Sequence, residues 1–166
     1  MSYTTTLADL DRHNACLPGM DLLHDALGRG FPPDRPFPHA AILRSNGALD
    51  AIWAIRTLPL PDRRALIRAI ARPIIERTPA DDDSYLLDST ELGDRFFRAV
   101  VSDGPVPRDL LREIFAAHAP QHAYTLLALA LARANAHALW LAATGLADKT
   151  LLSGSFNREL RDILEQ

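Results

Sequence analysis

The stretch AYTLLALALARANAHALWLAATGLA, residues 123–147, is the longest apolar segment of this 166-residue chain. Its length would cross a bilayer, but Arg133, Asn135 and His137 lie near its centre, where contact with lipid would be costly. Its many alanines would let neighbouring helices approach closely. We therefore predict a single buried helix over 121–145 as the central element of the fold.

Helical periodicity also dominates on both sides of this stretch, and the apolar–polar alternation that is typical of strands is nearly absent. We expect an all-α fold over 1–166, a single domain in which about eight helices surround the alanine-rich helix. A proline-rich connector at about 28–39 and an acidic connector at about 78–89 interrupt the helical pattern. The helices are expected at about 5–13, 15–28, 47–58, from 61 to beyond 74, 90–101, 107–118, 121–145 and 155–165.

The composition is that of a globular protein with a small negative charge. Hydrophobic residues make up 48% of the chain, charged residues 23%, and the net charge is −3. Nucleic-acid binding is not expected, because it needs many cationic side chains that contact phosphates, and the net charge is negative. The single cysteine excludes an internal disulfide and a multi-cysteine zinc site, and we expect no cofactor. A basic segment followed by an apolar run, as in a secretory signal, is absent from the start of the chain, so a cytoplasmic location is expected.

The segment DRHNAC, residues 11–16, contains that cysteine three residues after a histidine. Asn14 precedes an apolar pattern with helical spacing, and asparagine is among the best helix N-caps. We expect Asn14 to cap the helix and Cys16 to face the core, as free cysteines usually do. The alternative is a nucleophilic thiol with His13 as its base, but the position of His13 across the helix boundary is not fixed.

The alanine-rich helix carries a polar stripe. At 100° per residue, His122, Arg133, His137, Trp140 and Thr144 fall within about 60° of one face. Such groups must be solvated or paired. The stripe is either an exposed edge that meets acids of other helices or a partner-binding face, since tryptophan and arginine are enriched at binding hot spots.

A second candidate surface is formed by Arg64, Arg68 and Arg72, which are spaced i, i+4, i+8 opposite a stripe of isoleucines. This pattern is typical of a solvated helix face, and it would also suit an acidic partner. The partner-binding candidates are therefore His122, Arg133, His137, Trp140, Arg64, Arg68 and Arg72.

No motif predicts a metal or catalytic site. His118 and His122 are four residues apart, but Pro120 lies between them and further ligands are missing. The acidic run ADDDS, residues 80–84, lacks the glycine and closing glutamate of a calcium loop. The glycine-rich phosphate loops, the nucleophile elbow and the H-E-x-x-H motif are also absent.

The segments LDRHNACLPGMDLLHDAL, GALDAIWAIRTLP and DRRALIRAIARPIIE, together spanning about residues 7–77, resemble a family of small all-helical proteins of phages and bacteria. The resemblance rests on Asn14, Ala15, Cys16, Gly19 and Trp53. The chain departs from the pattern in Leu22-Leu23, where a tryptophan is common, and in its proline-rich insert. Some similar proteins are described as immunity proteins of toxin systems, so the resemblance implies a helical fold and a non-enzymatic role.

These observations favour a small cytoplasmic module that binds another protein: a toxin, a defence complex or an assembly subunit. The most concrete versions are an inhibitor, an immunity-type protein or a phage-encoded anti-CRISPR-like protein, since such roles need surface complementarity rather than catalytic groups. The alternative is a helical enzyme or small-ligand binder with a polar groove around His122, Arg133 and His137. A third hypothesis is a structural subunit or adaptor in a larger assembly. No membrane partner is expected.

Overall fold

A computed structural model describes residues 3–76, 91–102, 105–117, 123–147 and 154–165. The all-α fold is confirmed: these residues form ten α-helices, one short 3-10 helix and one two-stranded ribbon. The elements are β1 (Thr4–Thr5), α1 (Leu7–Arg12), α2 (Leu17–Leu27), β2 (Phe37–Pro38), α3 (Ala40–Asn46), α4 (Ala48–Ala54), η1 (Ile55–Thr57), α5 (Leu60–Glu76), α6 (Glu91–Val101), α7 (Arg108–Ala117), α8 (Ala123–Arg133), α9 (Ala136–Ala147) and α10 (Gly154–Leu164).

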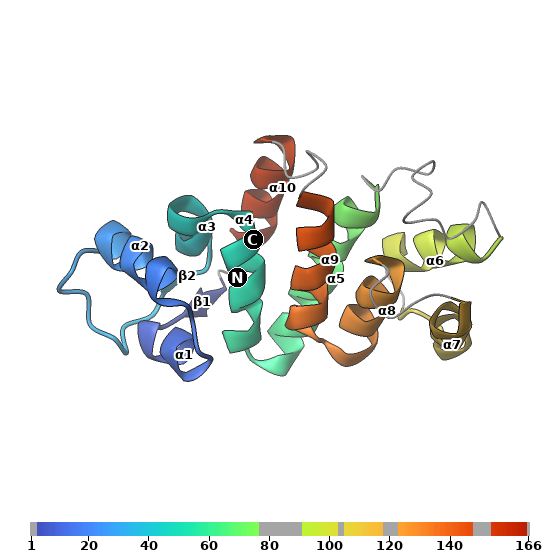
Figure 1. The fold of residues 1–166 in the computed structure, drawn as a ribbon, viewed down its shortest axis with the longest axis horizontal. Helices are drawn as coiled ribbons and strands as arrows, with labels where there is room; N and C mark the ends of the chain where they lie inside the picture. The colour runs from blue at the N-terminus through green and yellow to red at the C-terminus, as the bar shows by residue number, and fades with distance from the viewer. Residues whose placement is uncertain (1–2, 77–90, 103–104, 118–122, 148–153, 166) are drawn as a thin grey trace.

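The helices are arranged side by side along the long axis of the molecule, and the last three helices run back from one end toward the middle (Figure 1). Helices α1, α2 and α3 lie at one end, α6 and α7 lie at the other, and α4, α5, α9 and α10 occupy the middle. Helix α9 contacts α4, α5 and α8, so the alanine-rich segment does lie at the centre. The buried apolar side chains of the described residues form one continuous core cluster.

The prediction of a single helix over 121–145 is wrong, because the chain reverses between α8 and α9. Ala134 has a left-handed backbone with φ of 51°, and the N–H of Asn135 donates to the carbonyl of Ala130 at 3.1 Å, which closes α8 as a Schellman motif does. The Asn135 side chain then accepts from the N–H groups of His137 and Ala138 at 3.1 and 3.2 Å, and so caps α9. Two short helices therefore pack against each other where one long helix was expected.

The expected helix over 47–58 is also divided. It consists of α4 and the 3-10 turn η1, and α3 precedes it over residues for which no helix was expected. Gly47, with φ of 91°, separates α3 from α4 because it adopts a backbone that favours glycine.

The proline-rich connector is mostly exposed, but its last residues belong to the folded core. Phe37 and Pro38 pair antiparallel with Thr5 and Thr4, and the ring of Phe37 is buried. His39, the next residue, is fully buried at the start of α3. The acidic connector at 78–89 lies outside the described residues.

Helix α5 matches its predicted amphipathic pattern. Arg64 and Arg72 are exposed, and Arg68 is half-buried. The predicted inner stripe is buried, with at most 3% exposure for each of Leu66, Ile67, Ile70 and Ile74.

Candidate functional site

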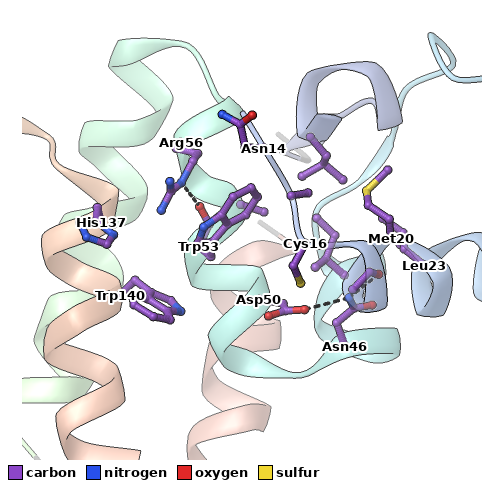
Figure 2. Close-up of a pocket in the computed structure, with 15 residues that line it drawn as sticks. Asn14, Cys16, Met20, Leu23, Asn46, Asp50, Trp53, Arg56, His137 and Trp140 are labelled. Atoms are coloured by element: carbon purple, nitrogen blue, oxygen red, sulfur yellow. Dashed lines mark hydrogen bonds between the residues drawn. The ribbon is translucent and has the colours of Figure 1, made fainter. Parts of the chain in front are cut away.

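Both tryptophans of the chain and its only cysteine line one cavity of about 300 Å³. The cavity lies between the start of α2, helix α4 and helix α9 (Figure 2). An apolar part of its wall comes from α1, α2 and α3, through Leu10, Met20, Leu23 and Ile42.

Helix α4 and η1 supply one side of the cavity through residues spaced three apart. This spacing places Asp50, Trp53 and Arg56 on successive turns of one face. The guanidinium of Arg56 lies over the Trp53 ring at 4.2 Å from its centroid, and its Nε donates to the Trp53 carbonyl at 2.9 Å. The indole therefore holds the cation in place by a cation–π contact and keeps it at the cavity wall.

Helix α9 supplies the opposite side. His137 and Trp140 lie one turn apart, and their rings stack with centroids 5.7 Å apart and planes inclined by 14°. The helix break positions this pair, because the Asn135 cap fixes the first turn of α9, to which His137 belongs.

The end of the cavity near α2 is polar. The Asn46 amide donates to the Asp50 carboxylate at 2.9 Å and to the Gly19 carbonyl at 2.8 Å. A Cβ on Gly19 would lie 3.0 Å from Asp50 Oδ2 and 3.1 Å from Cys16 Sγ. The lack of a side chain at residue 19 thus allows the carboxylate, the amide and the thiol to share one small space.

The predicted roles of Asn14 and Cys16 are both wrong. Asn14 has a left-handed backbone with φ of 61° in the turn before α2, and Cys16 itself occupies the N-cap position. The thiol is exposed rather than buried in the core. Pro18, in the first turn of α2, fits a helix that begins two residues later than the asparagine signal suggested.

A basic hollow adjoins the cavity, because Arg56 and His137 line both. We call it the vestibule, and its other charged or titratable members are His13, Arg63 and Arg133. Arg63 Nη2 donates to the carbonyls of Arg56 and Leu58 at 2.8 and 2.9 Å, which ties α5 to the end of η1. Burial, and then the nearby charge of Arg63, lower the pKa of Arg56.

A larger hollow of about 610 Å³ lies between α5, α7 and α8. We call it the arginine hollow. Its floor and walls include Val106, Leu111, Phe115 and Leu131, and Phe115 is 41% exposed. Its basic members are Arg64, Arg68, Arg108, Arg112 and Arg133.

The residues of the predicted polar stripe lie in different places in the structure. His122 lies outside the described residues, and the other members of the polar stripe do not form one continuous face, because the helix breaks at Ala134. His137 and Trp140 remain together at the cavity, whereas Arg133 lines the vestibule and the arginine hollow.

The predicted arginine stripe is also divided. Arg64 and Arg68 line the arginine hollow, and Arg72 is not among its residues. The sequence reasoning missed Asp50, Arg56 and Arg63, although the three-residue spacing of Asp50, Trp53 and Arg56 was a readable signal. Arg108 and Arg112 were also missed, although they are four apart on a predicted helix.

No protein-family model, curated protein sequence or solved structure matches this chain. No helix among the described residues is long and apolar enough to cross a membrane. The resemblance to helical proteins with an N-A-C helix start stays a prediction.

Proposed function

We propose that this chain is a small protein-binding module that holds an acidic, amphipathic segment of another protein in the arginine hollow. The observation that carries the proposal is the combination of five arginines with an apolar surface in one open depression. Neither feature alone would select such a partner.

Charge complementarity supports an acidic partner. Arg64 and Arg108 come from α5 and α7, so cations approach the hollow from two sides, and Arg133 adds a third from the end of α8. Arg112 pairs with Asp109 at 3.2 Å, and the two side chains are 80% and 86% exposed. An exposed pair of this kind contributes little to stability and can exchange for a partner's carboxylate.

The apolar surface supports a protein rather than a nucleic acid. Phe115 and Leu131 would meet the apolar face of an amphipathic helix, which is a common mode of peptide recognition. A nucleic-acid site would rely on phosphate contacts, and the net charge of −3 disfavours such contacts over the molecule as a whole.

An inhibitor or immunity-type protein fits this arrangement, because neutralising another protein requires a complementary surface and no reaction. A non-enzymatic role and a cytoplasmic setting belong to the same proposal. The free thiol of Cys16 suits a reducing compartment.

A defined probe tests the proposal: a synthetic amphipathic peptide with glutamates on one helical face and leucines on the other, measured by fluorescence polarisation against the full chain. The double variant Arg64→Glu/Arg108→Glu should weaken binding by about tenfold or more, because each reversed charge changes the interaction by roughly 1 kcal/mol at the surface. Arg29→Glu, 88% exposed on the loop after α2, is the matched control and should bind as the unaltered chain does.

Three outcomes would contradict the proposal: no binding of the peptide, equal binding by the double variant, or tighter binding of a single-stranded oligonucleotide of the same length and charge. In a lysate, a captured partner supports the proposal only if the double variant loses it and Arg29→Glu retains it.

A further inference from the structure

The cavity and the vestibule together form a site with two chemically different parts. The cavity offers indole and imidazole rings with an aliphatic wall, and the vestibule offers guanidinium groups. Arg56 and His137 belong to both parts, so a single molecule can occupy both. This site shares only Arg133 with the arginine hollow, and the inference does not depend on the proposed function.

The vestibule has positive charge that the described part of the chain does not neutralise. Its three arginines are Arg56, Arg63 and Arg133, and no acidic side chain among the described residues lines it. Arg56 Nη2 and Arg63 Nε are buried without a hydrogen-bond acceptor. Buried donors and cations without partners are costly, so an anion in this hollow would stabilise the fold as well as bind.

The cavity selects the other part of the ligand. Trp53 and Trp140 present flat rings from α4 and α9, and His137 stacks on Trp140. A volume of about 300 Å³ is at the lower end for small-molecule sites. It is too small for a helical segment of a partner, because a helix with its side chains is roughly 10 Å across.

We propose that this site binds a small aromatic anion, with its ring in the cavity and its carboxylate or phosphate in the vestibule. The positions of the charged side chains determine this orientation of the bound molecule. In Figure 2, Arg56 lies on the side of Trp53 that faces α9, whereas Cys16 and Asp50 lie on the side that faces α2. The carboxylate of Asp50 would repel the anionic group from the α2 end and accept a hydrogen bond from a ring substituent there.

Intrinsic fluorescence is a direct readout, because both tryptophans of the chain line the cavity. The probes are adenosine monophosphate and phenylacetate, which present a phosphate and a carboxylate on an aromatic molecule. Their neutral counterparts are adenosine and 2-phenylethanol, and inorganic phosphate tests the anionic group alone. We expect saturable quenching by at least one aromatic anion and binding about tenfold weaker for its neutral counterpart and for phosphate, since charge-assisted hydrogen bonds are the stronger class.

Two variants locate the binding. Arg56→Gln should weaken the aromatic anion by about tenfold and leave the neutral counterpart unchanged, because only the anionic group is affected. If Arg56→Gln does not fold, Arg133→Gln, at an exposed position, should show the same selective loss. Arg29→Gln, at a residue that lines neither the cavity nor the vestibule, is the control.

Comparing adenosine monophosphate with phenylacetate shows whether the site prefers a phosphate or a carboxylate. Saturable quenching by either probe supports the site. The inference is overturned if neither aromatic anion changes the fluorescence at millimolar concentration. It is also overturned if the neutral counterparts bind as tightly as the anions, or if both folded arginine variants bind like the unaltered chain.

Discussion

The buried side chain of His39 should make the free energy of unfolding of this protein fall as the pH is lowered. The side chain is fully buried at the start of α3, and neither imidazole nitrogen has a hydrogen-bond partner of good geometry. Burial lowers the pKa of His39 from 6.5 to about 4, and a nearby backbone group of Ala51 offsets only part of this effect. The imidazole is therefore neutral in the folded protein at every pH above about 4.

The sign of the pH dependence follows from proton counts. Between pH 6.5 and 4 the unfolded chain carries a proton on residue 39 and the folded protein does not, so acid favours unfolding. The stability is fully present above pH 6.5 and falls as the pH drops toward 4. At about 1.36 kcal/mol per pKa unit, the total loss is roughly 3 kcal/mol, of which about 2 kcal/mol is lost by pH 5.

The substitution His39→Leu tests this reasoning. Leucine has no group to protonate and leaves no unpaired nitrogen, so the free energy of unfolding at pH 8 should be unchanged or slightly higher. Between pH 8 and pH 5 the unaltered chain should lose about 2 kcal/mol more than the variant, as measured by urea unfolding. His13→Ala, at an exposed position, is the control and should follow the unaltered chain. Parallel curves for the unaltered chain and His39→Leu would refute the reasoning.

Three further predictions concern other parts of the fold. Ala134→Gly should stabilise the protein by up to about 1 kcal/mol, because glycine tolerates the left-handed backbone at that position; thermal melting would show an unchanged or lower midpoint if this is wrong. Asn135→Ala should cost about 1 kcal/mol through loss of the α9 cap, and an unchanged midpoint would contradict the role of that cap. Cys16 should react with a thiol reagent in the native protein at a rate close to that of the denatured chain, and strong protection would contradict its exposure.

The parts of the fold that sequence predicted best are those where a single helix face is buried. The buried stripe of α5 was predictable, because its apolar residues repeat at helical spacing and all belong to the core: Leu66, Ile67, Ile70 and Ile74. The start of α1 was predictable because threonine is a preferred N-cap residue, and the hydroxyl of Thr6 accepts from the N–H of Asp9.

The helix breaks were harder to predict, because their signals are weak in sequence. Ala134 adopts a left-handed backbone without being a glycine, and the alanine-rich pattern continues on both sides of it. Asn135 is a normal capping residue, but in the middle of an apolar run it looked like a polar group on a continuous helix. In the same way Asn14 offered a cap that the chain does not use, and Cys16 took its place.

The candidate sites were predictable only in part, since each is assembled from helices distant in the chain. Arg64 and Arg68 were found through their spacing on one helix, but nothing local indicates that Arg108 and Arg133 approach the same hollow. Trp53 and Trp140 are 87 positions apart and meet at one cavity because α4 packs on α9.

The most direct test of the central claim, that the arginine hollow binds an acidic partner segment, is the affinity of the acidic amphipathic peptide for three chains: unaltered, Arg64→Glu/Arg108→Glu and Arg29→Glu. We predict saturable binding to the unaltered chain and to Arg29→Glu, and a loss of about tenfold or more in the double variant. Equal affinity for all three folded chains would show that the arginine hollow is not the binding surface.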